Sequence, residues 1–182
     1  MSIVRRFADL EPVPWRNGRG VTREVVAEPA GAAWAWRVSM AEVAGDDDFS
    51  VFPDVDRTII VVAGGGMALT VDGVETVLAE PFVPFAFDGD ATTACRLLVG
   101  PLRDLNLMVR RGAARATPDV VALRAGAAHG VLGAGALVVL DGTLRAGADV
   151  LVACDAVVLA EGDALAAVAG RAGATLAVVA VS

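Results

Sequence analysis

The segment Pro14–Glu24 carries the densest set of groups able to bind a small polar molecule. It combines an indole at Trp15, an amide at Asn17, two glycines and alternating charges at Arg23 and Glu24. Such a mixture is typical of a loop that leads into a strand and lines a pocket. Asn17 is either a plain turn residue or an amide that contacts a formyl or carboxyl oxygen. Because neighbouring strand residues face opposite sides, we expect at most one of Arg23 and Glu24 to contact a ligand.

Further along the chain, arginines and paired polar residues supply more candidate binding groups. Asp56 and Arg57 adjoin at the start of a β-branched run. They form either a fixed pair that presents the guanidinium to a carboxylate, or a solvated salt bridge of little energetic value. Arg37 is a further candidate cation. Asp104 and Asn106 have the same parity on one expected strand, so both face either solvent or the interior of a pocket.

Several kinds of catalytic and metal-binding site are excluded because the residue types they need are rare or absent in the chain. It has one histidine, His129, in a stretch predicted to be a loop, and it has no lysine and no tyrosine. Cys95 and Cys154 stand alone without a CxxC spacing. Catalytic triads, Schiff bases and transition-metal sites depend on these missing residue types. We therefore expect no metal and no other cofactor.

Charge and hydropathy narrow the possible partners. The 182 residues carry a formal net charge of -7, with 15 arginines against 22 acidic residues. Without clustered cations the chain is not expected to bind nucleic acid. The hydrophobic fraction of 55% is mostly alanine and valine, and no window approaches the uninterrupted length of a membrane span. Charge also appears too early for a secretory signal, so the sequence predicts a cytoplasmic protein.

The elements that must position these residues are predicted to be strands. Apolar runs alternate at period two or end in glycine, and Asp72-Gly73 is a hairpin signal. Many short strands with evenly spaced turns indicate an all-β antiparallel sandwich or barrel. The same order of strands and turns recurs after a polar connection, which favours two such units fused in one chain. A composition rich in alanine, valine and glycine can also produce this repeat by accident. The expected strands are 57–63, 67–71, 74–78, 84–87, 94–99, 103–110, 137–140, 149–153, 156–159 and 175–181, with a turn at 141–142 and the connection at about 112–120.

The two halves differ in chemistry. All nine aromatic residues lie within the first 87 positions, and residues 1–111 hold 11 of the 15 arginines. Ligand pockets are usually aromatic clefts with a few polar groups. We therefore expect an N-terminal unit, 1–111, that holds the pocket and a degenerate C-terminal unit, 112–182, packed with it as one compact body. A homodimer is a possible assembly.

Four motifs together resemble the HutD/Ves family of bacterial proteins. They are Pro-Trp-x-Asn-Gly-x-Gly-x-Thr-Arg-Glu from Pro14, Phe-Pro-x-x-Asp-Arg-Thr from Phe52, Phe-Asp-Gly-Asp from Phe87 and Asp-Leu-Asn-Leu-Met from Asp104. The resemblance covers about 60% of the chain. It implies a duplicated cupin-like fold and a role beside histidine utilisation.

Two departures from the family pattern concern the first of these motifs. Arg16 stands where the family usually has lysine. This keeps the positive charge but replaces a compact ammonium group with a planar guanidinium group. Arg19 stands where glycine is more familiar, so its side chain is a candidate for narrowing the pocket.

The resemblance and the residues together predict a metal-independent binding protein for a small anionic metabolite of histidine degradation, similar to formylglutamate or urocanate. Its role would be regulatory or buffering. The ligand-binding set consists of Trp15, Asn17, Arg23, Glu24, Arg37, Asp56, Arg57, Asp104 and Asn106. The alternatives are a metal-free enzyme that uses carboxylates such as Glu24 or Asp104 as general acid and base, and a scaffold for a pathway enzyme.

Overall fold

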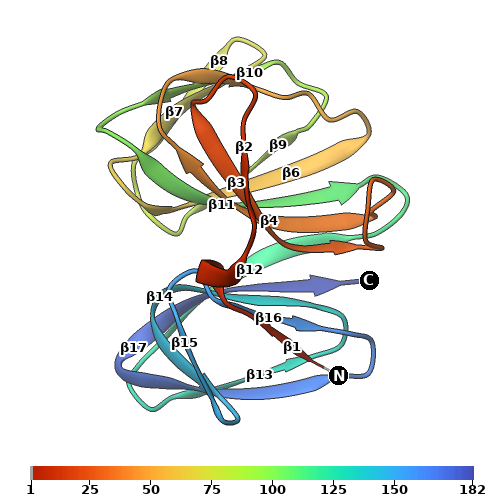
Figure 1. Ribbon diagram of the computed structural model, residues 1–182, viewed down its shortest axis with the longest axis vertical. Helices are drawn as coiled ribbons and strands as arrows, with labels where there is room; N and C mark the ends of the chain where they lie inside the picture. Colours follow the sequence, from red (N-terminus) through yellow and green to blue (C-terminus); the bar gives the residue numbers. More distant parts are fainter. Residues whose placement is uncertain (1) are drawn as a thin grey trace. The chain divides into compact units, whose positions relative to one another are not determined.

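The computed structural model describes residues 2–182, which form two compact units built of antiparallel strands (Figure 1). The larger unit is Glu11–Ala114. The smaller unit combines residues 2–10 with Arg115–Ser182. The short strand at the N-terminus belongs to the smaller unit because it pairs with a strand near the C-terminus, Ile3 opposite Val158.

One sheet of the larger unit has the strand order β2-β3-β4-β11-β6-β9. Strand β11 occupies an interior position and pairs with β4 on one side and β6 on the other, although both partners lie far from it in sequence. The bounds are β2 Pro12–Pro14, β3 Gly20–Glu28, β4 Trp36–Val43, β6 Val55–Ala63, β9 Pro84–Asp88 and β11 Leu102–Arg110.

The other sheet of the larger unit has the order β5-β10-β7-β8. Asp72 and Gly73 join β7 to β8 with φ of 46° and 82°, and two successive positive φ values are the signature of a type I′ turn. The predicted hairpin is therefore confirmed. The bounds are β5 Asp47–Phe49, β7 Met67–Val71, β8 Val74–Leu78 and β10 Thr93–Leu97.

A hydrophobic core in the larger unit draws on both of its sheets. Ile59 and Val61 of β6 cluster with Met67 and Leu69 of β7 and with Cys95 of β10, and all five side chains are buried. Burying a side chain of this size is worth about 1.5–3 kcal/mol relative to leaving it exposed. This core holds the two sheets of the unit together.

The smaller unit is one continuous sheet with the order β1-β16-β14-β17-β12, in which β13 also pairs with β17 and β15 with β14. A 3-10 turn, η1 Phe7–Asp9, follows β1. The bounds are β1 Ile3–Arg5, β12 Ala116–Leu123, β13 Ala128–Leu132, β14 Gly135–Ala146, β15 Asp149–Val152, β16 Ala156–Leu159 and β17 Ala164–Val181.

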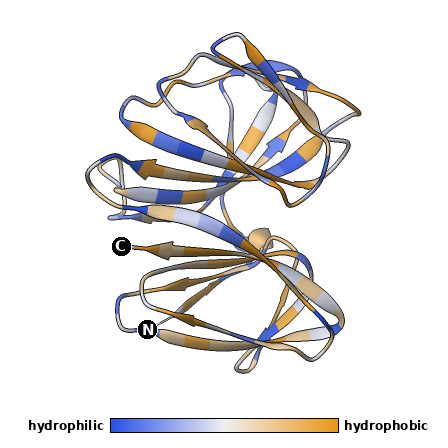
Figure 2. Cartoon of the chain, turned by 180° about the vertical axis from the view of Figure 1, so that it is seen from behind, coloured by the Kyte–Doolittle hydropathy of each residue, from blue (hydrophilic) through white to orange (hydrophobic). Residues whose placement is uncertain are grey.

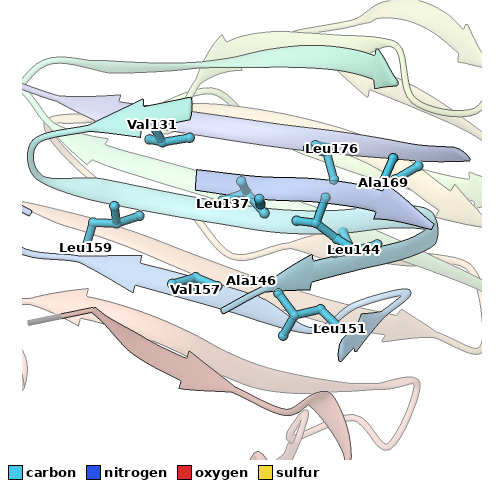
Figure 3. Packing of buried hydrophobic residues seen from close by; sticks show 12 residues of the cluster. Val131, Leu137, Leu144, Ala146, Leu151, Val157, Leu159, Ala169 and Leu176 are labelled. Carbon is cyan, nitrogen blue, oxygen red and sulfur yellow. The ribbon is translucent and has the colours of Figure 1, made fainter. Parts of the chain in front are cut away.

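The core of the smaller unit is aliphatic. Leu137, Leu144, Leu151 and Leu176 are fully buried and pack with valines and alanines (Figure 3). Hydrophilic residues are more frequent on the strands of the larger unit than on those of the smaller one (Figure 2). The polar chemistry of the chain is therefore concentrated in the larger unit.

Three sequence-based expectations for the smaller unit are wrong. Asp141-Gly142 is not a turn, because β14 continues through it as an irregularity with Gly142 at φ 77°. A glycine in this conformation is typical of a β-bulge, which resembles a turn in the sequence. The predicted connection at 112–120 includes the start of β12, and His129 lies on β13 instead of in a loop. Alternation in these stretches is weak because most of their side chains are small.

No stretch of residues 2–182 forms a helix long and apolar enough to cross a membrane.

Candidate ligand-binding site

A pocket of about 600 Å³ opens in the larger unit beside the inner face of the first sheet. Its floor comes from β4, β6 and β11, and its walls come from the loop before β3 and the segment around β5. The lining residues are Pro14, Trp15, Arg16, Asn17, Thr22, Arg37, Ser39, Ala41, Asp47, Asp48, Phe49, Ser50, Phe52, Arg57, Asn106 and Met108.

Strand register brings the polar floor residues together. Met108 of β11 is the Cα partner of Arg57 on β6 and of Arg37 on β4. Two residues earlier on β11, Asn106 is the partner of Ser39 on β4. Directly paired residues share a face of the sheet, and so do residues two apart on one strand. Two guanidinium groups, one amide and one hydroxyl therefore point to the same side.

Arg57 is the deepest cation of the pocket, with only 4% of its surface exposed. Its Cζ atom lies 5.4 Å from the ring centres of Phe49 and Phe52 and 4.8 Å from that of Phe87, within cation-π range. Its Nη1 donates a long hydrogen bond of 3.3 Å to the carbonyl oxygen of Ser50. The buried Nε has no hydrogen-bond partner among residues 2–182.

Burial also shifts the pKa of Arg57 and the pKa of the Asp104 carboxyl group. Desolvation lowers the pKa of Arg57 to about 10, and Asp104 partly offsets this. Desolvation raises the pKa of Asp104 to about 7, against the attraction of Arg57. At neutral pH the guanidinium is therefore charged, while the carboxyl group is close to its midpoint. Asp104 is 1% exposed, lies two residues before Asn106 on β11 and does not line the pocket.

Arg37 is the second cation on the pocket floor and is held by Glu24. Its Nε donates to a Glu24 carboxylate oxygen at 2.8 Å. Arg23 instead forms an ion pair with Glu42 at 3.6 Å. Only Glu24 of the adjacent pair thus reaches a pocket residue, which agrees with strand alternation.

The loop before β3 forms one wall. The Trp15 Nε1 donates to the Thr22 hydroxyl at 2.8 Å, and the indole packs edge-on against Phe49 with ring centres 6.1 Å apart. Both ends of the Asn17 carboxamide are engaged, because its Nδ2 donates to Asp47 and its Oδ1 accepts from the Arg19 backbone N–H at 2.9 Å. Trp15 is thus a fixed wall, and Asn17 holds the loop in place.

Of the two departures from the family motif, only one reaches the pocket. Arg16 contributes to the lining, whereas Arg19 does not and donates to the Asp46 carbonyl oxygen.

Asp56 does not pair with Arg57. It is exposed, lies outside the pocket lining and binds Arg111 at 2.7 Å. Arg111 also binds Asp88 and, at 2.7 Å, Asp90. Consecutive residues of β6 point to opposite faces, which separates Asp56 from Arg57. The hypothesis of a fixed Asp56–Arg57 pair at the pocket mouth is therefore wrong.

Some pocket residues were not among the predicted set. Asp47 and Asp48 are typical of a solvated acidic loop by sequence, yet they lie on β5 and line the pocket. Ser39 becomes visible only through its pairing with Asn106. Phe49 and Phe52 belong to the aromatic-rich first half, and that enrichment is the signal that would have singled them out.

The comparisons with known proteins agree with this architecture. The family model described as HutD matches residues 7–178.

The chain belongs to the HutD family.

Curated relatives of this HutD-family chain include an uncharacterized 21.2 kDa protein in the hutC 3′ region of Pseudomonas putida. That protein is 38% identical over 105 residues, which cover 57% of this chain and 55% of the relative. Protein Ves of Citrobacter koseri is 37% identical over 115 residues, 60% of each chain. The chain thus matches little more than half the length of these relatives.

Among solved structures, HutD from Pseudomonas fluorescens SBW25, described for a formate condition, is similar over 100% of this chain and 98% of that one. Its TM-score is 0.84 and its sequence identity is 29%. The predicted all-β, duplicated cupin-like fold and the resemblance to HutD/Ves are confirmed.

The pocket wall of this HutD-family chain depends on Gly20. A Cβ atom at this position would lie 2.7 Å from the Trp15 ring. We expect Gly20→Ala to displace the indole, to lower the unfolding free energy by about 1–2 kcal/mol through overpacking and to shift Trp15 fluorescence. Thermal unfolding and emission spectra measure both effects.

Gly130→Ala is the matched control, because Gly130 also lies in a strand and its nearest atom would be the Leu165 carbonyl oxygen at 3.9 Å. An unchanged spectrum and stability for Gly20→Ala would contradict the assignment of Trp15 as a fixed wall.

Proposed function

We propose that this chain binds a small anionic metabolite of histidine degradation, of the formylglutamate or urocanate type, without a metal ion. Its role is to buffer or signal the level of that metabolite. Within residues 2–182 no three His, Cys, Asp or Glu side chains are grouped so as to hold a metal ion. The proposal therefore assigns ligand recognition to arginine and amide groups.

The observation that carries the proposal is Arg57 at the base of the pocket. A buried guanidinium is costly unless its charge and hydrogen bonds are compensated. The nearby Asp104 supplies only part of that compensation, because its carboxyl group is itself near its midpoint at neutral pH. A ligand carboxylate entering the pocket would supply a full charge and accept the free N–H bonds. Arg37 adds to the positive field on the same floor.

The metabolic context supports the choice of ligand. One relative lies in the hutC 3′ region of P. putida, and a solved neighbour is HutD of P. fluorescens under a formate condition. Both names concern those proteins, and their link to the hut genes favours a metabolite of histidine breakdown as the ligand of this one.

Asp104 favours one alternative, a metal-free enzyme. A buried carboxyl group with a pKa of about 7 suits general acid–base catalysis at neutral pH. However, Asp104 does not line the pocket, and Glu24 is bound to Arg37. Neither carboxyl group is thus placed against a bound molecule, and we favour binding over catalysis.

Calorimetric titration with N-formylglutamate and with urocanate tests the proposal. We expect at least one to bind, its methyl ester to bind more weakly, and proton NMR of the mixture to show the ligand unchanged after prolonged incubation. Equal affinity for the acid and its ester would overturn the assignment of a carboxylate site. Conversion of the ligand would favour the enzyme.

A further inference from the structure

Asn106 is a buried residue of the pocket floor with an amide side chain. It is 7% exposed and lines the pocket. Its Oδ1 is buried without a hydrogen-bond partner among residues 2–182. Its neighbours across the sheet are Ile59 on β6 and Ser39 on β4.

An unsatisfied buried acceptor is unusual because it loses its hydrogen bond to water and gains nothing in return. Asn17, the other asparagine of the pocket, shows the contrast, since both ends of its side chain are bonded to the protein. Asn17 thus holds structure together, whereas the Asn106 acceptor is left for a molecule that enters the pocket.

The spacing between Asn106 and Arg57 limits what such a molecule looks like. Met108 is the register partner of Arg57, and Asn106 lies two residues before it on the same face. Residues i and i+2, which share one face of a strand, are about 6.5–7 Å apart. A ligand whose carboxylate binds Arg57 therefore reaches Asn106 with an atom that is only a few bonds from that carboxylate. Trp15, Phe49 and Phe52 line the space around these groups, which suits a planar group.

We propose that the pocket selects carboxylates that also carry a planar N–H group, such as an amide, and that Asn106 is the specificity-determining residue that accepts the hydrogen bond from this N–H. The inference rests on the proposed function, because Arg57 must hold the carboxylate. It adds that a carboxylate of the same shape without the N–H binds poorly, since it leaves the Asn106 acceptor buried and unpaired.

A matched trio of small acids tests the selectivity in the unmodified protein. N-acetylglycine carries the N–H, 4-oxopentanoate replaces it with CH₂, and N-acetylsarcosine replaces its hydrogen with a methyl group. We expect N-acetylglycine to bind about 5- to 150-fold more tightly than either analogue, the range for leaving one buried hydrogen-bonding group unpaired. NMR titration measures all three affinities.

Asn106→Leu removes both polar atoms while keeping the side-chain size. In this variant we expect the preference for N-acetylglycine over 4-oxopentanoate to fall to within about twofold, mainly through weaker binding of the amide. Arg96→Ala is the control, because Arg96 is exposed in the same unit, pairs with Glu75 and lies outside the pocket lining, so its loss should leave the ratio of the two affinities unchanged.

The outcomes separate this inference from the proposed function. Equal binding of N-acetylglycine and 4-oxopentanoate to the unmodified protein, or an undiminished preference in Asn106→Leu, overturns the role of Asn106 and leaves the carboxylate site standing. If neither N-formylglutamate nor urocanate binds in a manner that depends on Arg57, the proposed function fails and the inference fails with it. If one of them does bind in this way but no acid of the trio binds, the inference alone fails. The comparison of N-acetylglycine with 4-oxopentanoate uses the unmodified protein, so it tests the proposal even if Asn106→Leu folds poorly.

Discussion

Replacing Arg57 with alanine is expected to weaken binding of N-formylglutamate or urocanate, whichever binds the unmodified protein, by about 10- to 150-fold. This is the range for losing a charged hydrogen bond worth about 1.5–3 kcal/mol. Arg57 is 4% exposed and is the deepest cation on the pocket floor, so little water is available to replace it. Calorimetric titration of the two proteins measures the difference.

Arg57→Lys should restore only part of the affinity. An ammonium group lacks the two parallel donors that match a carboxylate, and it fits less well among the rings of Phe49, Phe52 and Phe87. Arg96→Ala is the matched control, because Arg96 belongs to the same unit but is exposed, pairs with Glu75 and lies outside the pocket lining. Equal affinities for the unmodified protein and a folded Arg57→Ala would show that Arg57 is structural and would move attention to Arg37.

The free energy of unfolding is expected to fall by about 3 kcal/mol more between pH 5 and pH 8 in the unmodified protein than in Asp104→Asn. Burial raises the pKa of Asp104 from 3.8 to about 7 in the folded protein. A raised carboxyl pKa stabilises the fold fully below the unfolded value, and this stabilisation is lost as the pH rises through the folded value. Between about pH 4 and pH 7 the folded state holds a proton that the unfolded state has released, so stability falls by roughly 1.4 kcal/mol per pH unit.

Urea unfolding at several pH values measures this slope. The comparison uses the slope and not the absolute stability, because Asp104→Asn also removes a charge that favours the Arg57 cation. Asp119→Asn, at an exposed position of β12, is the control and should leave the slope unchanged. A slope for Asp104→Asn that matches the unmodified protein would mean that the Asp104 carboxyl group is already ionised at pH 5.

Much of the fold was predictable because strand alternation and turn chemistry are local. The run at 57–63, the Asp72-Gly73 hairpin and the strand 103–110 all correspond to observed elements. The prediction failed where side chains are too small to alternate clearly. The first half of β17, Ala164–Val181, was missed for this reason, and the bulge at Gly142 was mistaken for a turn.

The residue types that form the pocket could also be predicted from the sequence. Arginine, amide, carboxyl and indole groups stood out in the first half, and the absence of lysine, tyrosine and clustered histidine limited the chemistry available to them. Strand alternation alone placed Asp104 and Asn106 on one face and separated Arg23 from Glu24, although neither of these two lines the pocket.

Only the tertiary structure decided which of these groups meet. Arg37, Arg57 and Asn106 lie on three different strands, and the pairing of β11 with both β4 and β6 brings them to one floor. The same register placed Asp56 on the outside with Arg111 and enclosed Arg57 among three phenylalanine rings. Register between strands far apart in sequence depends on long-range packing, and a shift of one residue would turn every side chain to the other face. The sequence therefore determined the chemistry available to the pocket, whereas strand register determined which residues form it.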